Sequence, residues 1–342
     1  MAKMKSMHCP VCGMEKDTSV WYETSCQKCG YSYAFIQYAA GNQSLQLLNL
    51  KQEAARHDFR RKRISTYAQA RAISLTGGSV AFVSTKDKKL TIIHGDGSSE
   101  TQENVVQYSA NDRNSAVLFT SGAFRVSGDN SYGQCDAEET DTAAFVMCAP
   151  NSTYIIDRNG KVKAYGAIVD HSYEKWTDIA AMACGSYHIL GLTRDGQVKI
   201  AGDMIESGIK KEIASWKEVR AVAAATDCSI GLLCDGTVKF AGRADDPRRE
   251  SVNWKNMEAI QADSSYVVGI NADGDVLMAG YSKAFLDMGR KEAGNWKDML
   301  AISCSKSGIA GLSEKGSLQI VGSFSGEKDQ VCKVWSEQVK IE

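Results

Sequence analysis

The chain has 342 residues, of which 43% are hydrophobic and 24% are charged, and its formal net charge at pH 7 is −1. This length and composition are ordinary for a globular protein with one large and one small domain. No apolar run approaches the roughly 18 residues that a membrane span needs, so we expect no membrane-spanning segment. Thirty glycines stand against only three prolines, and with thirteen tyrosines they favour many short strands joined by tight turns.

The cysteines indicate the compartment. Of the eleven cysteines, four are clustered at metal-binding spacing and seven are scattered singly among apolar residues. Residues 1–20 contain no apolar core of a secretory signal peptide. Because this distribution is typical of a reducing environment, we expect a cytoplasmic protein.

Residues 1–40 are predicted to form a zinc ribbon. They contain two Cys-x-x-Cys-Gly motifs, Cys9 with Cys12 and Cys26 with Cys29, and each motif places two thiolates on one tight turn. Four thiolates complete the tetrahedral shell of a zinc ion and leave no open coordination position. The sequence therefore predicts one structural Zn²⁺ per chain and no catalytic metal.

Residues 41–68 are predicted to form a helical linker, because they are rich in helix formers and place apolar residues on one face. This linker ends in the basic run 60–63. Such a run could contact nucleic acid, or it could be a solvated group of cations that complements the helix dipole. Residues 1–65 contain ten Lys and Arg against five Asp and Glu, whereas the rest of the chain is net acidic. The two parts could therefore face different partners.

From residue 69 onward the sequence repeats. In four units a Trp is followed 26 positions later by a Gly, with a second Gly six positions before the last one. Three earlier units keep the glycines without the Trp, so the expected total is seven. The four clear units are 176–202, 216–242, 254–280 and 296–322.

Each unit is predicted to be one four-stranded antiparallel sheet. In the unit 176–202, three runs of strand-forming residues are separated by short turns, and one of the turns is Asp195-Gly196. A fourth strand is expected near each Trp. Such a sheet cannot bury both faces alone, so seven of them should stack radially as the blades of an all-β propeller over residues 69–342.

The ends of the propeller should meet. Trp335 begins an eighth unit that stops at the C-terminus, whereas the first unit has Gln69 in the place of the Trp. We therefore expect residues 335–341 to pair with the first blade as a strand and to close the ring.

These repeats resemble those of the regulator of chromosome condensation family. The resemblance covers roughly residues 69–342 and rests on the repeated unit around Cys184-Gly185 and His188 and on the segment 128–134, which is similar to the family's G-x-N-x-x-G-Q signature. The repeats are about 38 residues apart, a compactness similar to that of bacterial members. The resemblance implies a seven-bladed propeller, and it raises guanine-nucleotide exchange on a small GTPase as one possible activity.

Candidate binding residues are expected on the long connections between repeats. In up-and-down blades these connections share one face with the turns between the first two strands, and the Asp-Gly turns lie on the other face. Aromatic anchors and charges on such loops commonly carry binding. The candidates for partner binding are Tyr132, Tyr173, Tyr281, Phe285, Phe324, Arg243, Arg248 and Arg249.

Catalysis is not expected. The sequence contains no paired carboxylates, no Ser/His/Asp arrangement and no phosphate-binding loop, so we expect neither an enzyme nor a small-molecule substrate. The favoured interpretation is a scaffold whose loop face binds a protein, with the zinc ribbon as a second interaction module. One alternative is nucleic-acid association through the basic ribbon and helix, and the other is nucleotide exchange, which resemblance of fold alone supports weakly.

Overall fold

The computed structural model describes residues 7–8, 15–16, 42–69, 71–138, 140–168, 170–202, 206–280 and 289–341, with side chains from residue 55 onward within α1. They fall into two compact units, Met1–Arg63 and Ile64–Glu342, and each is described by itself. The four predicted zinc ligands, Tyr281 and Phe285 lie outside the described residues. None of the described helices is both long and apolar enough to span a membrane.

The first unit contains a small antiparallel pair of strands. β1 (Met7–His8) and β2 (Glu15–Lys16) pair with Met7 opposite Lys16. The predicted helix is present as α1 (Asn42–Gln69), which begins in the first unit. Its last residues belong to the second unit, where Ile64 and Tyr67 are buried in the core.

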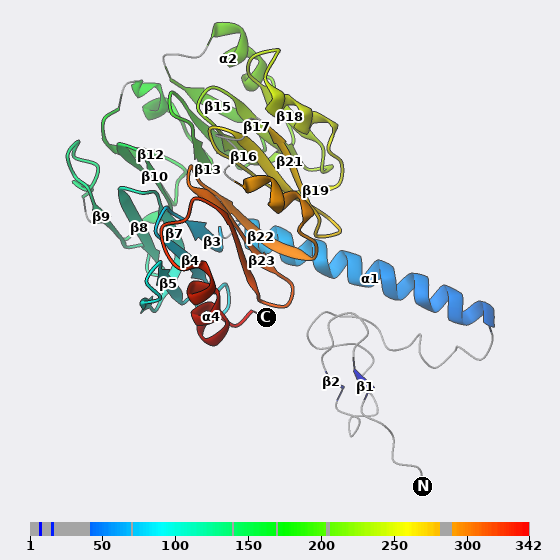
Figure 1. Cartoon of the computed structure of the whole chain (residues 1–342). Helices are drawn as coiled ribbons and strands as arrows, with labels where there is room; N and C mark the ends of the chain where they lie inside the picture. The colour runs from blue at the N-terminus through cyan, green and yellow to red at the C-terminus, as the bar shows by residue number, and fades with distance from the viewer. Residues whose placement is uncertain are drawn as a thin grey trace. The chain divides into compact units, whose positions relative to one another are not determined.

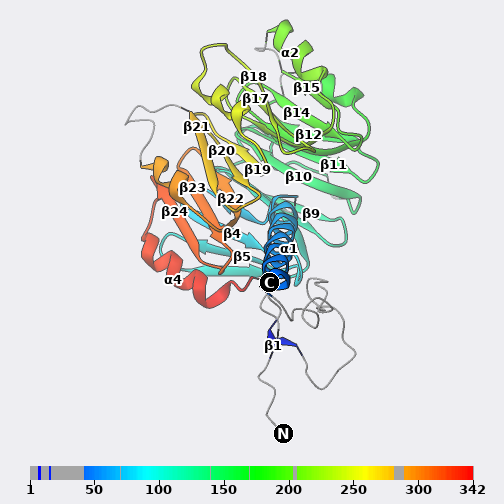
Figure 2. The same ribbon diagram turned by 90° about the vertical axis from the view of Figure 1, so that its right-hand side faces the viewer.

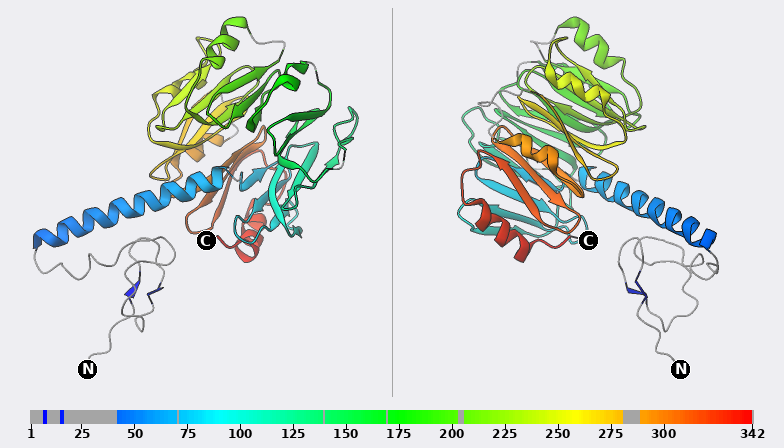
Figure 3. Two further views of the ribbon diagram at one scale, coloured as in Figure 1. Left: turned by 180° about the vertical axis from the view of Figure 1, so that it is seen from behind. Right: turned by 45° about the vertical axis from the view of Figure 1, so that its right-hand side comes forward.

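Seven antiparallel sheets follow one another through the second unit in chain order, from cyan to orange in Figure 1 and in the two views of Figure 3. The innermost strands contact one another in succession, and the last of them, β22, contacts the first, β3. The ring is therefore closed, and the prediction of a seven-bladed propeller is confirmed. The blades are β3 (Ile73–Leu75), β4 (Ser79–Val83), β5 (Leu90–His94) and β6 (Ser99–Gln102); β7 (Val105–Ala110), β8 (Asn114–Phe119) and β9 (Phe124–Gly128); β10 (Ala143–Ala149), β11 (Ser152–Asp157) and β12 (Val162–Gly166); β13 (Ile179–Cys184), β14 (Ile189–Thr193) and β15 (Val198–Ala201); β16 (Val219–Ala224), β17 (Ser229–Leu233) and β18 (Val238–Ala241); β19 (Met257–Ala262), β20 (Tyr266–Asn271) and β21 (Val276–Gly280); and β22 (Met299–Cys304), β23 (Gly308–Ser313) and β24 (Leu318–Gly322).

Only the first of these sheets has four strands, so the prediction of a fourth strand at each Trp is wrong. A short helix takes that place before each Trp or around it. The local cause is visible in two of the helices, where Asp170 and Asp246 accept hydrogen bonds from the backbone N–H two residues on and cap the helical turn. The helices are η2 (His171–Lys175), α2 (Ser207–Ala214), η3 (Pro247–Asn253), η4 (Arg290–Asn295) and α4 (Lys328–Gln338).

Each of the four clear repeats also has a glycine in its middle strand, and this glycine has a packing explanation. The glycine in the middle strand of a blade lies against the Trp ring of the same repeat. A methyl group added at Gly191 would lie 2.7 Å from the ring of Trp176, and one added at Gly311 would lie 2.6 Å from Trp296. The absent side chain therefore makes room for the buried indole, which is a constraint that only glycine satisfies without displacing the Trp.

In the last five blades the second and third strands are joined by glycine turns, such as Asp195-Gly196 and Asn159-Gly160, and most of these turns also form hydrogen bonds to the next blade. Their glycines have φ between 76° and 85°, as the hairpin interpretation requires. In four of the turns the glycine carbonyl accepts a hydrogen bond of 2.9 to 3.0 Å from the first N–H of the next innermost strand. Each of these turns therefore closes the hairpin of its own blade and holds the innermost strand of the next blade by a hydrogen bond. These glycines are Gly160, Gly196, Gly236 and Gly274.

The ring closes through a helix and not through the predicted strand. Helix α4, red in Figure 2, lies against β24 of the last blade and β5 of the first. Trp335 is fully buried, its ring packs edge-on against Phe82 at 5.7 Å, and its Nε1 donates to the Gly316 carbonyl at 3.0 Å. The segment contacts the first blade as expected, but by side chains, as the other repeat helices do.

Candidate functional site

The propeller has two chemically different faces. The strand registers place the turns between the first two strands of each blade, and the connections that follow the third strand, on one face, which we call the loop face. The turns between the second and third strands, such as Asp195-Gly196, lie on the opposite face, which we call the hairpin face. This arrangement is the one predicted from the repeat.

A central cavity opens on the loop face. It has a volume of about 590 Å³, and all seven blades contribute to its wall. Three cysteines at equivalent ends of innermost strands line it, Cys148, Cys184 and Cys304. Burial raises the pKa of the Cys148 and Cys184 thiols to about 12, so both thiols stay neutral at physiological pH. The cysteines are therefore part of the wall and not nucleophiles.

A second cavity, of about 290 Å³, lies toward the hairpin face and is lined by the end of α1, including Tyr67 and Ala68. Arg71, just after the helix, lines both cavities. The central channel is therefore narrower toward the hairpin face, where the end of α1 lines it, and wider toward the loop face.

Three of the eight predicted binding residues are buried. Tyr173 is 4% exposed and packs edge-on against Tyr154, Phe324 is 8% exposed within the core, and Arg248 is 1% exposed. Buried side chains cannot serve as anchors for a partner, so the prediction is wrong for these three residues. Tyr173 and Arg248 lie in the short helices η2 and η3 that the connections form, and Phe324 lies in the core just before α4.

Two tyrosines are exposed on the loop face. Tyr132, which was predicted, is 52% exposed on the connection after β9. Tyr187 is 48% exposed in the turn between β13 and β14. It was not among the predicted binding residues, because these were sought on the long connections between repeats. The sequence feature that could have identified Tyr187 is its position next to His188 in the repeat.

The remaining predicted arginines interact locally. Arg243 is exposed but forms an ion pair with Asp245, with Nη2 and Oδ2 3.0 Å apart. Arg249 is half-buried, and its guanidinium lies over the ring of Phe240, 5.3 Å from the centroid. Arg243 therefore presents a charge that its neighbour partly compensates, and Arg249 contributes to packing.

The signature-like segment 128–134 builds a defined loop. The Asn130 side chain accepts from the N–H of Cys135 at 2.7 Å and donates to Asp136, and Gln134, fully buried, accepts from the N–H of Tyr132 at 2.9 Å. Because the polar side chains hold the backbone from within, Tyr132 is presented on a fixed loop.

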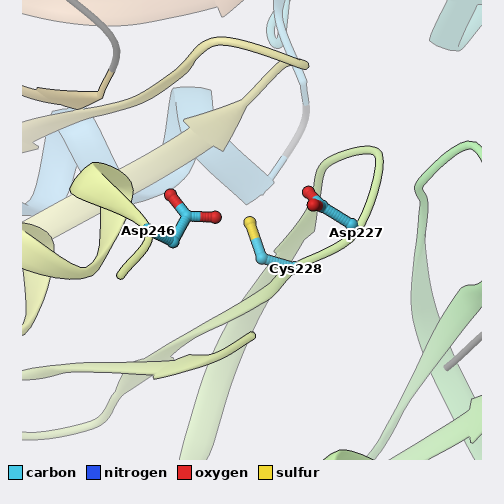
Figure 4. A group of neighbouring side chains, drawn as sticks. All are labelled: Asp227, Cys228 and Asp246. Carbon is cyan, nitrogen blue, oxygen red and sulfur yellow. The ribbon is translucent and has the colours of Figure 1, made fainter. Parts of the chain in front are cut away.

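One group of side chains has the proximity of a metal site. The ligand atoms of Asp227, Cys228 and Asp246 lie within 4.8 Å of one another. Figure 4 shows the three side chains. The Arg248 guanidinium binds both carboxylates of this group. It donates hydrogen bonds to Asp246 at 2.9 and 2.6 Å and to Asp227 at 2.5 Å. Both carboxylates are therefore compensated by an arginine, and we interpret the cluster as a structural ion-pair network.

His188 connects two blades. It is 3% exposed, and its Nε2 lies 2.8 Å from Ser229 Oγ of the next blade, so the hydrogen bond links two blades. Burial lowers the pKa of His188 to about 4. The imidazole is therefore neutral in the folded protein at physiological pH.

This lowered pKa predicts acid sensitivity. The unfolded chain binds a proton at His188 near pH 6.5 and the folded chain only near pH 4, so stability should fall as the pH drops through that window, by about 3 kcal/mol at most. Urea unfolding at several pH values should show a shallower fall for His188→Gln than for the wild type. His94→Gln, at a half-exposed side chain, is the control. Equal pH dependence in His188→Gln and wild type would contradict the assignment.

Comparisons with known proteins agree with this architecture. Residues 179–205 match the family profile described as the regulator of chromosome condensation (RCC1) repeat. A search of curated protein sequences found no match. Among solved structures, the CRINKLY WD40 ectodomain of the Arabidopsis thaliana receptor kinase ACR4 is similar at 13% identity, with a TM-score of 0.56 over 75% of this chain and 96% of that one.

A second similar structure is Prp20p from Saccharomyces cerevisiae, also at 13% identity, with a TM-score of 0.51 over 78% of this chain and 84% of that one. A further structure shows the same yeast protein, RCC1 (Prp20), bound to Kap60, with the same identity and TM-score over 78% and 82% of the two chains. The profile match is confined to one repeat, and the similarity to these structures shows that the second unit has a β-propeller fold.

Proposed function

We propose that the protein is a non-enzymatic binding scaffold whose loop face docks a protein partner. The observation that carries the proposal is the pair of exposed tyrosines, Tyr132 and Tyr187, on the face where the central cavity opens. Large aromatic side chains on rigid loops bury much area at low entropic cost, which is why they dominate protein interfaces. The binding of Gsp1p, histones and Kap60 described for the similar yeast propeller supports a protein as the partner.

The zinc ribbon serves as a second interaction module in this proposal. Its support is the spacing of the four cysteines, together with the pairing of β1 and β2 on either side of the first Cys-x-x-Cys motif. Cysteine thiolates on two such turns would hold one zinc ion, which supplies folding energy and no chemistry.

The loop face is testable once the partner has been captured with the intact chain and purified. We expect Tyr132→Ala combined with Tyr187→Ala to weaken the partner's affinity by at least tenfold, because two exposed anchors are lost. Stability should change little, since both side chains are largely solvent-exposed. Titration calorimetry measures the affinity, and urea unfolding checks the stability.

The matched control lies on the hairpin face. Lys161→Ala combined with Lys315→Ala changes two exposed residues beside the hairpin turns at Gly160 and Gly316 and should leave the affinity unchanged. If the lysine variant loses the partner while the tyrosine variant binds normally, the docking face has been assigned to the wrong side of the propeller.

A further inference from the structure

Arg71 occupies an unusual place for a charged side chain. It follows α1 with a left-handed backbone conformation, φ 48°, and lines both cavities of the central channel. Its Nη2 donates to the carbonyl of Met182 in β13, and its guanidinium lies over the ring of Phe145 in β10, 4.8 Å from the centroid. Two blades therefore hold the guanidinium in a fixed position inside the channel.

The guanidinium has no counter-ion. Within the part of the chain that the structure describes, no carboxylate lies within ion-pair distance of Arg71, and burial is the cause of its lowered pKa, about 10. The two carboxylates that line the cavities are engaged elsewhere. Asp112 accepts a hydrogen bond of 2.6 Å from the Gly77 N–H, and Glu258 pairs with Arg220 at 2.8 Å. Arg71 nevertheless stays charged at physiological pH, because even the lowered pKa lies well above 7.

The cavity around Arg71 suits an anion. Among the described residues, its wall contains, besides Arg71, two cations near the loop face, Lys306 and Arg113, of which Arg113 pairs with Asp129 at 3.9 Å, and one carboxylate, that of Asp112. Hydroxyl and amide groups of serines and asparagines supply further hydrogen-bond donors. The volume of about 590 Å³ lies within the range of small-molecule sites.

We propose that the loop-face cavity is a binding site for a small molecule with a carboxylate or phosphate group, which pairs with Arg71. An uncompensated charge inside a protein is costly, and an anion that reaches the guanidinium from the loop face removes that cost through charge-assisted hydrogen bonds. The site is independent of the docking proposed above, because the anion lies inside the channel and not on the exposed tyrosines.

Titration calorimetry on the full-length protein tests the proposal. The two arms use succinate as a carboxylate and inorganic phosphate as a phosphate, at constant ionic strength, with succinamide as the uncharged control. We expect saturable binding in at least one arm, none with succinamide, and an affinity about tenfold to hundredfold lower for Arg71→Gln. Arg194→Gln, an exposed arginine on the hairpin face, should bind as the wild type does.

A second variant guards against a folding defect in Arg71→Gln. Gln261 lines both cavities together with Arg71, and Gln261→Glu adds a carboxylate there with almost no change in shape. We expect this variant to melt at a temperature at least as high as the wild type, and to bind the anion at least tenfold more weakly through repulsion and competition. The proposal is overturned if neither anion binds the wild type, or if Gln261→Glu and folded Arg71→Gln bind as tightly as the wild type.

Discussion

Removal of zinc is expected to unfold the segment of residues 1–40 while the propeller keeps its melting temperature. A ribbon of this size has too little apolar core to fold alone, so metal binding supplies most of its folding free energy, about 10 to 16 kcal/mol for comparable structural sites. The propeller contains no cluster of cysteines at ligand spacing in its described residues, and the two carboxylates that lie within ligand distance of Cys228 are compensated by Arg248.

Elemental analysis and chelation would measure this effect. The purified protein should contain one zinc per chain, and Cys12→Ser should lose it. Cys234→Ser, at an exposed cysteine of the propeller, is the matched control and should keep the metal. Well under one zinc per wild-type chain, or full metal content in Cys12→Ser, would show that the four cysteines do not form the site.

The second large effect should come from the C-terminal helix. Truncation after Val334 removes Trp335 and Val339, which are 0% and 6% exposed, and with them the contacts between the last and first blades. We expect the free energy of unfolding to fall by about 3 to 5 kcal/mol, the usual cost of deleting a large buried aromatic. Trp335→Ala should account for most of this loss.

Urea unfolding monitored by circular dichroism would decide the point. Ser336→Ala changes an exposed neighbour on the same helix and should have almost no effect. The ring has other closing contacts, including a hydrogen bond of 3.0 Å from the Leu75 N–H to Ser303, so the truncated protein should be weakened but still folded. An unchanged stability after truncation would mean that α4 does not hold the ring closed.

The repeat made most of the fold predictable. In the four clear repeats the Trp requires a glycine in the middle strand, and the turn after that strand requires a residue that tolerates positive φ, so both constraints recur at a constant spacing in the sequence. The number of repeats gives the number of blades. The blades stack into one ring because a single blade cannot bury both of its sides. The outer elements were harder to predict, since a capped helical turn such as 171–175 is too short for a periodic pattern.

The seven blades, their turns and the candidate zinc ligands could all be predicted from the amino-acid sequence, because local constraints and a constant spacing encode them. The exposure of the candidate residues could not be predicted, because it depends on tertiary contacts. Tyr173 and Arg248 are buried by the helices that precede the next blade, whereas Tyr187 lies open in a short turn. The tertiary structure also decided that Arg71 faces a central cavity, since that cavity exists only after seven distant segments have come together. Burial and proximity depend on contacts between blades, and these have no signature within one repeat.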